Sequence, residues 1–341
     1  MSALIVRQAG PGLSIQDAGR QGWLAFGLSR GGAADLEALA EGAALLRQSV
    51  DCAALEMAGF GGVFEAEGGL RIALTGAPMR AAIDGASVAW NASHALRTGQ
   101  RLSVGGAEAG VYGYLHVGGG FATQEVLGSR AAHLAAGLLG PVREGDRLPA
   151  GDDVGGPTGL TFAPEDRFSG GTVRIVPSAQ TGMFAAAERA RFEATCFTRD
   201  ARGNRQGVRL VNDGAPFAAE GQLSILSEII VPGDIQMTGE GVPYVLLPEC
   251  QTMGGYPRIG TVVPDDLPLV AQAAPGTELR FRFVDAAEAL EDHRVRQAEA
   301  PKRRAAMITP LLRDPREMAD LLSHQLVGGV TAGRDLDEEE K

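Results

Sequence analysis

The chain has 341 residues, of which 45% are hydrophobic, and its 42 acidic residues outnumber its 31 basic residues to give a formal net charge of -11. Because single cores stop growing near ~250 to 300 residues, this length predicts two folded units rather than one. The acidic balance argues against nucleic acid as a partner, and three widely spaced cysteines without a C-x-x-C pair argue against a disulfide framework or a zinc knuckle.

Strand signals run along most of the chain. The 48 glycines and 18 prolines separate short apolar runs, for example residues 70–75, 111–117 and 244–247, and this pattern is typical of β-rich folds. Between the runs 79–83 and 86–90, Asp84-Gly85 predicts a two-residue hairpin, because both central positions of a type I′ turn need positive φ. No apolar run approaches the ~20 residues of a membrane-spanning helix, and we expect a cytoplasmic protein with no membrane partner.

Helices are expected in four places: residues 35–46, opened by a capping Asp35, then 182–191, 265–272 and 285–306. A further amphipathic piece at 315–326 precedes an acidic end at 335–340. The stretch 150–171, rich in Gly, Pro and Asp, is the expected boundary between units. We therefore predict a mainly β fold with a few helices, of the α+β class. Its expected divisions are 1–155, 156–285 and a charged helical extension with an acidic tail at 286–341.

Most standard catalytic signatures are missing from the chain. Its two lysines, Lys302 and Lys341, lie in neither a glycine-rich phosphate loop nor a biotin-carrier hairpin, so most of any ATP or biotin machinery must lie on other chains. Residues 27–31 match the G-x-S-x-G pattern around Ser29, but a β-rich chain with the serine this early does not suit an α/β-hydrolase. The five histidines lack metal-ligand spacing, so no metal site is expected. His116, on an apolar strand, is interpreted as a satisfied histidine.

Four separated groups of segments carry a family pattern. They are residues 10–20 (GPGLSIQDAGR) with 31–35 and 54–56, residues 114–120 (YLHVGGG) with 127–130, residues 204–210 (NRQGVRL) with 226–228 and 232–236, and residues 251–262 (QTMGGYPRIGTV). In this order and spacing, over about residues 3–285, the chain resembles the family labelled allophanate hydrolase subunit 2, KipA-like protein, biotin-dependent carboxyltransferase or the C subunit of 5-oxoprolinase. It departs from the family in having Ala131 and Ala132 where Ser-Thr is usual, and Gln206 where Met is frequent.

The resemblance implies two cyclophilin-like β-barrel subdomains, A and B. It also implies a sister subunit with subdomains C and D, of the KipI or allophanate hydrolase subunit 1 type. Reactions of this family act on small planar amides, either urea carboxylated from carboxybiotin or the lactam of 5-oxoproline opened to glutamate with ATP. Since neither a biotin carboxylase nor a biotin carrier is present, the resemblance favours the C subunit of an ATP-dependent 5-oxoprolinase.

Such a subunit would be inactive alone, with ATP bound with or by partner subunits that include a LamB/YcsF-type protein. One alternative is a carboxyltransferase subunit that uses biotin on a separate carrier. The other is a non-catalytic KipA-like regulator that binds a kinase-inhibitor homologue.

The motif residues are of the types that planar amides and carboxylates require. Gln16, Gln236 and Gln251 can make paired amide contacts, while arginines can hold a carboxylate or phosphate in a forked geometry. Four motif acids could act as general bases if burial raises their pKa values: Asp17, Asp35, Glu56 and Glu228. Glu228 and Asp17 are favoured; the alternative for Asp17 is to brace a loop beside Arg20, and for Asp35 to cap a helix. The expected substrate-binding set is Gln16, Arg20, Asn204, Arg205, Gln236, Gln251, Thr252, Gly254, Gly255, Tyr256 and Arg258.

The glycine pair Gly254-Gly255 has two interpretations. Its backbone N–H groups can approach a ligand closely and bind a developing oxyanion beside Tyr256. Alternatively, it forms a hairpin bend with a packed tyrosine. Because the chain has no complete local triad or nucleotide loop, we expect the site to be shared with the sister subunit.

Overall fold

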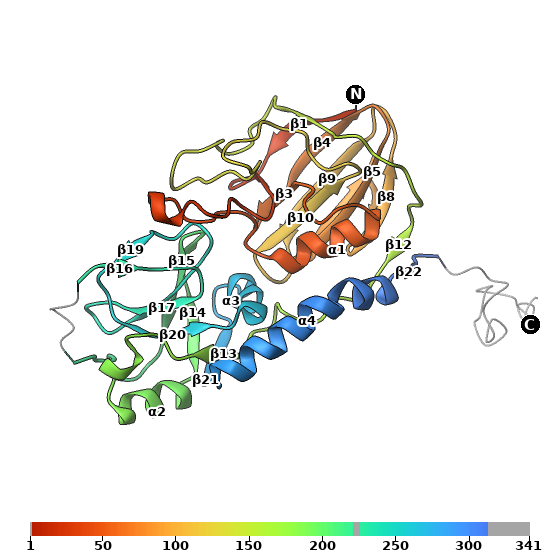
Figure 1. Cartoon of the computed structure of the whole chain (residues 1–341). Coiled ribbons are helices and arrows are strands. Elements are labelled where there is room, and N and C mark those ends of the chain that lie inside the picture. The colour runs from red at the N-terminus through yellow and green to blue at the C-terminus, as the bar shows by residue number, and fades with distance from the viewer. Residues whose placement is uncertain (1, 221–225, 313–341) are drawn as a thin grey trace, which may run out of the picture.

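The computed structural model describes residues 2–220 and 226–312, and within these ranges the chain is mainly β with a few helices, as predicted (Figure 1). The strands form two units, which lie at the upper right and lower left of Figure 1. The helix expected at 315–326 and the acidic end at 335–340 lie outside the described residues. None of the described helices has both the length and the apolar character that crossing a bilayer requires.

The first unit consists of two sheets that enclose one core. Their strand orders are β11-β1-β4-β9-β6-β7 and β2-β3-β10-β5-β8-β12-β22. Alternation of side chains along a strand sends Leu102 of the first sheet and Leu74 and Leu115 of the second into the same cluster. Where the resemblance implied one barrel, hydrogen bonds thus join the described strands into two facing sheets. The hairpin at Asp84-Gly85 is confirmed, with φ of 49° and 84°.

The strands of the first unit have the following bounds. The first sheet contains β1 (Ala3–Ala9), β4 (Gly62–Glu67), β6 (Met79–Ile83), β7 (Ala86–Val88), β9 (Arg101–Ala107) and β11 (Arg147–Pro149). The second contains β2 (Ser14–Gln16), β3 (Ala54–Ala58), β5 (Leu70–Gly76), β8 (Ala92–Leu96), β10 (Tyr112–Val117), β12 (Leu160–Thr161) and β22 (Thr309–Pro310).

The second unit is a closed barrel, which confirms the barrel expected in this half. Its strand order is β13-β20-β17-β18-β15-β14-β21. A separate antiparallel pair, β16 and β19, forms a short ribbon beside it. Four phenylalanines fill the barrel with ring centroids as close as 4.9 Å: Phe192, Phe197, Phe217 and Phe281. Side-chain alternation along β17 directs Ile235 and Met237 into this core, and so directs Gln236 to the outer face.

The strands of the second unit are β13 (Gly171–Val176), β14 (Phe197–Asn204), β15 (Gly207–Val211), β16 (Glu228–Ile229), β17 (Asp234–Met237), β18 (Pro243–Leu246), β19 (Met253–Gly254), β20 (Arg258–Val262) and β21 (Glu278–Phe283). The helices are α1 (Leu36–Leu46), α2 (Ala186–Ala194), α3 (Leu267–Gln272) and α4 (Ala286–Met307), with short 3-10 turns η1 (Leu24–Phe26), η2 (Thr181–Met183) and η4 (Pro264–Asp266). Each of the four predicted helices thus has a counterpart.

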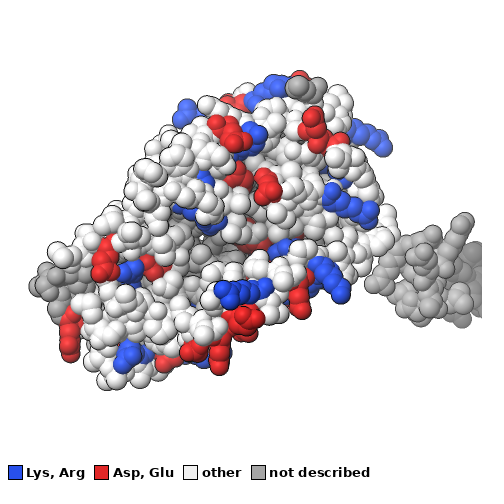
Figure 2. All heavy atoms as spheres, in the orientation of Figure 1, with Lys and Arg blue, Asp and Glu red and all other residues white. Residues whose placement is uncertain are grey.

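Two connections hold the units together. The chain crosses from one to the other at residues 162–170, after β12 has paired with β8 of the first unit. Helix α4 then runs back along both units, and the chain after it forms β22, which pairs with β12 (Figure 1). Its Arg304 forms an ion pair with Glu37 of α1 at 2.7 Å. Figure 2 shows both acidic and basic side chains along this helix, as expected for a face that contacts solvent.

Candidate functional site

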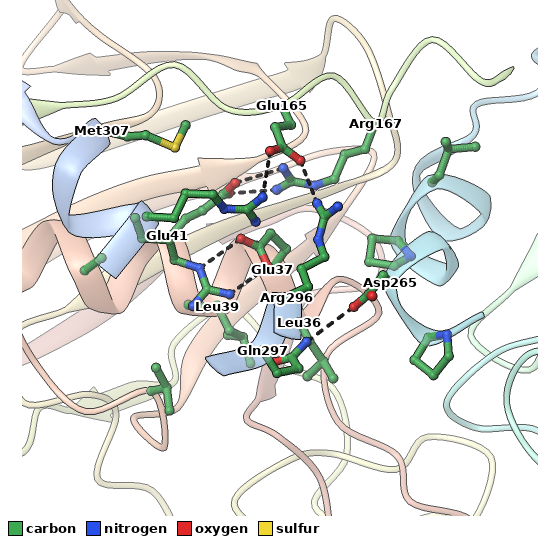
Figure 3. A pocket seen from close by; sticks show the side chains of 18 of the residues that line it. Leu36, Glu37, Leu39, Glu41, Glu165, Arg167, Asp265, Arg296, Gln297 and Met307 are labelled. Atoms are coloured by element: carbon green, nitrogen blue, oxygen red, sulfur yellow. Dashed lines mark hydrogen bonds and ion pairs between the residues drawn. The ribbon is translucent and has the colours of Figure 1, made fainter. Parts of the chain in front are cut away.

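Two cavities of about 510 Å³ each are large enough for a small metabolite. The first, the junction cavity, lies between α1, residues 162–167, η4 and α4 (Figure 3). The second, the barrel cavity, lies on the outer face of the barrel and is lined by residues from β14, β15, β17, β18 and the loop after β18. The chemistry of their walls distinguishes them.

The junction cavity has a wall of mutually satisfied charges. Its ion pairs are Arg167 with Glu41, Arg304 with Glu37, and Arg296 and Arg303 with Glu165 (Figure 3). Arg167 also reaches Asp35 at 2.6 Å, and Gln272 of α3 donates to the same carboxylate at 2.9 Å. These contacts link α1, the crossing segment and the second unit, so we assign the junction cavity a structural role.

The barrel cavity contains four of the predicted binding residues: Asn204, Gln236, Gln251 and Tyr256. Gln236 is 8% exposed, and its Nε2 has no hydrogen-bond partner in the described chain. A buried amide donor without a partner costs about 1–3 kcal/mol, so binding of a ligand or water to it is favourable. The Nε2 atom is itself covered by Gly254, so a ligand in the cavity meets it only when the Gln236 side chain turns towards the cavity. The barrel cavity is therefore our candidate functional site.

A row of side chains runs across the barrel strands below this cavity. Gln236 is opposite Tyr244 in the register of β17 and β18, and Tyr244 is opposite Arg209 in the register of β18 and β15. Residues directly opposite each other project from the same face, so all three lie on the outside of the barrel. Gly254 of β19 covers the Gln236 amide so closely that a Cβ on it would lie 2.4 Å from Nε2. The missing side chain at Gly254 therefore makes room for this amide.

Glu228 and Arg258 are adjacent to the cavity without lining it. Glu228 of β16 pairs with Gly254 of β19, and its carboxylate accepts from Arg258 at 2.6 Å. Arg258 also donates to Asp234 at 3.2 Å, and its backbone N–H and its Nε both donate to Oε1 of Gln180. The side chain of Glu228 remains 51% exposed. This predicted base is thus held by a cation beside the cavity; its catalytic role stays a prediction.

The other residues of the 251–258 motif form the ribbon over the site. The carbonyl of Thr252 accepts from Ile230 at 3.1 Å, which joins the loop to the ribbon. Gly255 is exposed and lies outside the cavity lining, and Tyr256 lines the cavity with 48% of its surface exposed. The side chain of Tyr256 is therefore available to a ligand.

Arg205 binds the two units together instead of facing the cavity. It follows β14, is 7% exposed, and donates from Nε to Glu249 at 2.5 Å, from Nη1 to Glu56 and from Nη2 to the carbonyl of Gly32. Glu56 is fully buried on β3 and also accepts from Tyr114 at 2.7 Å. Burial alone would lower the pKa of Arg205, but Glu56 and Glu249 outweigh it and raise that pKa. The result is a charged bridge between the units.

Gln16, Asp17 and Arg20 brace one loop of the first unit. Asp17 accepts from the Ser129 hydroxyl at 2.6 Å and the Arg130 N–H at 2.7 Å, while Arg20 donates to Ala131 at 2.6 Å. Gln16 donates to the Ala132 carbonyl at 3.2 Å. One atom each of Gln16 and Arg20 has no hydrogen-bond partner among the described residues, but neither residue lines the barrel cavity. The structure thus shows the bracing contacts that were the alternative for Asp17.

Ser29 of the G-x-S-x-G pattern meets a histidine that the sequence did not single out. Its Oγ lies 2.9 Å from Nε2 of His133, whose Nδ1 accepts from the Ala136 N–H at 3.2 Å and lies 3.9 Å from Glu249. An accepting Nδ1 places the proton of the neutral ring on Nε2, which then donates to Ser29 and cannot deprotonate it. Both side chains are buried, at about 3% exposure. The contact is structural.

His116 is a buried, hydrogen-bonded histidine, as interpreted from its apolar strand. It is 2% exposed, lies 2.8 Å from the Thr75 hydroxyl, and burial lowers its pKa to about 3. Because the pKa in the unfolded chain is about 6.5, the folded state holds fewer protons below that pH. His116 therefore contributes stability above about pH 6.5 that is lost as the pH falls towards about 3.

We expect the wild-type chain to lose about 2 kcal/mol more unfolding free energy between pH 7 and pH 5 than a His116→Gln variant, which has nothing to titrate there. Urea unfolding of both proteins at the two pH values measures this difference. Parallel losses in the two proteins would show that His116 does not titrate on unfolding.

Two further observations limit the chemistry of the site. Cys250 lines the barrel cavity, but burial raises the pKa of its thiol to about 12, so it is neutral and a poor nucleophile near neutral pH. Within residues 2–220 and 226–312, no group of three or more His, Cys, Asp or Glu side chains is placed to hold a metal ion.

Sequence reasoning missed Arg202 and Tyr244, which both line the barrel cavity. Arg202 lies two residues before the motif residue Asn204, and this closeness was an available signal. The register of β14 shifts between Arg199 and Gly203, so regular alternation does not place the Arg202 side chain. The position of Tyr244 in a row with Gln236 depends on pairing between distant strands, and no local pattern reveals it.

The fold and site define a class of protein: a two-unit β protein with a metabolite-sized cavity on the outer face of its closed barrel. The family model described as carboxyltransferase domain, subdomain A and B, matches residues 26–283, and the chain belongs to this family. The resemblance found in the sequence motifs is thereby confirmed.

Two relatives carry the same name. The chain is 30% identical over 280 residues to the 5-oxoprolinase C subunit of Haemophilus influenzae, covering 81% of this chain and 89% of that protein. It is also 30% identical over 295 residues to the 5-oxoprolinase C subunit of Escherichia coli, covering 84% and 93%.

Solved structures support the fold. The crystal structure of TTHA0988 matches with a TM-score of 0.76 and 30% identity over 83% of this chain, which spans 55% of the length of that protein. The Kluyveromyces lactis urea carboxylase matches with a TM-score of 0.77 over 92% of this chain and 31% of its own length, but at 22% identity it shows the fold alone.

Proposed function

We propose that the chain is the C subunit of an ATP-dependent 5-oxoprolinase, which opens the lactam of 5-oxo-L-proline to L-glutamate together with partner subunits in the cytoplasm. The observation that carries the proposal is the barrel cavity, whose wall holds the buried, unpartnered amide of Gln236. The names of the two bacterial relatives, of which the chain covers 89% and 93%, supply the substrate.

The cavity is equipped to bind an amide more than to break one. Amide groups of Asn204, Gln236 and Gln251 can pair with both the N–H and the carbonyl of a lactam. None of the described residues that line the cavity is a carboxylate or a lysine. This chain would therefore orient the lactam, while partner subunits supply the phosphate chemistry of ATP and the attacking water.

Glu228 is the residue of this chain best placed to assist that chemistry. It lies on the ribbon beside Gly254 with an exposed carboxylate, so a partner that packs against the ribbon could bring substrate and base together. We propose a sister subunit with subdomains C and D, of the KipI type, and a LamB/YcsF-type subunit as these partners.

Reconstitution tests the proposal. The chain, the sister subunit and the LamB/YcsF-type subunit are purified and assayed for glutamate release from 5-oxo-L-proline with ATP, together and with each component omitted in turn. We expect activity from the complete set and its loss when this chain is left out. Full activity without this chain, or none from the complete set, contradicts the proposal; a biotinylated partner or a bound kinase-inhibitor homologue would then favour one of the alternatives.

A further inference from the structure

Two guanidinium groups share one carboxylate at the edge of the barrel cavity. Arg202 donates from Nε and Nη2 to the two oxygens of Asp200, each at 3.1 Å, and Arg209 donates to Asp200 at 2.6 Å. Glu240 attracts Arg202 more weakly and forms no ion pair with it among the described residues. Asp200 carries one negative charge and the two guanidinium groups carry two positive charges. One positive charge is therefore not balanced by a hydrogen-bonded carboxylate among the described residues.

Arg202 is the member of this group that lines the barrel cavity. Its side chain is 70% exposed, its Nη1 makes no hydrogen bond within the described chain, and it alone is charged among the described residues lining the cavity. In a molecule with a net charge of -11, a cation at the cavity edge is the feature that would attract an anion against the overall field. The bond to Asp200 also holds its planar fork in one orientation.

The row of side chains below the cavity is long enough for a small ligand with two polar ends. Gln236, Tyr244 and Arg209 lie in one row over three neighbouring strands, so the two ends of the row are about 10 Å apart at the backbone. Arg202 lies in the irregular part of β14, between the paired residues Arg199 and Gly203, where Asp200 reaches Arg209. Arg202 and Gln236 both line the cavity, and a row of this length can accommodate a molecule with an amide carbonyl at one end and an anion at the other.

We propose that Arg202 anchors the carboxylate of the substrate, so that the barrel cavity selects an anionic amide over a neutral one. The inference rests on the proposed function and adds a residue that determines specificity. 5-Oxoproline carries one carboxylate beside its lactam, whereas urea carries none. The Nη1 group of Arg202, which makes no bond to Asp200, would donate to that carboxylate while Gln236 meets the lactam carbonyl.

Titration calorimetry on the complete complex tests this. The ligands are 5-oxo-L-proline and its neutral carboxamide, 5-oxo-L-prolinamide, and the proteins are wild type, Arg202→Gln and Arg294→Gln. Arg294 is a matched control, because it is 67% exposed, has one ion pair to Glu291 at 3.8 Å and lies on α4, away from the cavity.

We expect wild type to prefer the carboxylate ligand by about fivefold, and Arg202→Gln to lose that preference without changing its affinity for the carboxamide, since an ion pair at an exposed guanidinium adds a modest affinity for the charged ligand alone. Arg294→Gln should behave as wild type. Equal weakening of both ligands, an unchanged preference in Arg202→Gln, or no preference in wild type overturns the inference. Glutamate release is measured separately. If the complex hydrolyses 5-oxoproline but Arg202→Gln leaves the ligand preference unchanged, the role of Arg202 is rejected while the proposed function stands.

Discussion

An Arg205→Met substitution is expected to lower the free energy of unfolding by about 3–5 kcal/mol, because it leaves two buried carboxylates without their cation. Glu56 is fully buried and Glu249 is 2% exposed, and both depend on the Arg205 guanidinium that crosses between the units. Methionine fills a similar volume, so the loss would come from charge and hydrogen bonding rather than from a cavity. Urea unfolding at neutral pH measures it.

The matched control is Arg7→Met, which removes an arginine from an exposed pair. Arg7 is bonded to Glu65 at 3.1 Å and its side chain is 48% exposed, so water can replace the lost partner and the expected loss of stability is much smaller. A similar small cost for both substitutions would mean that the bridge between the units contributes little to stability.

A Gln236→Leu substitution is expected to reduce kcat/KM for glutamate release by the complete complex about 10- to 100-fold, because the amide donor of the cavity wall is lost. The same substitution should leave the unfolding free energy unchanged or slightly higher, since it removes a buried polar group that has no partner in the described chain. Opposite effects on activity and stability distinguish a binding group from a structural one.

Gly254→Ala provides a second test of the same amide. The added Cβ would lie 2.4 Å from Nε2 of Gln236, so the side chain must move away from its present position. We expect a loss of activity similar to that of Gln236→Leu. Unchanged activity in both variants would remove Gln236 from the site.

The sequence was sufficient where structure depends on neighbouring residues. Asp35 caps α1 by accepting from the Ala38 N–H at 3.1 Å, and Asp84-Gly85 forms the predicted turn. In both places one or two residues determine the local geometry. The alternation in β17 similarly places Gln236 outside a barrel of apolar side chains.

The motif residues could not be sorted from sequence alone, because a family pattern includes residues that shape the fold as well as residues that meet a ligand. Gln16 and Asp17 brace the loop around residues 129–132, and Arg205 bridges the units, whereas Gln251 lines the cavity. The segments around Gln16, Asn204 and Gln251 nevertheless converge. Glu56 lies opposite Ser14 in the register of β3 and β2 and accepts a hydrogen bond from Arg205. Arg205 also donates to Glu249, which precedes the cavity residues Cys250 and Gln251.

We expect the Gln236 side chain to receive the amide of the substrate, and this contact can be observed directly. Its NH₂ resonances can be followed in the nitrogen-15 NMR spectrum of the complex labelled in this chain, and assigned by their absence from Gln236→Leu. As 5-oxo-L-proline is added, we predict that these resonances move to lower field and saturate together with binding. Resonances that stay fixed while the ligand binds would contradict the claim.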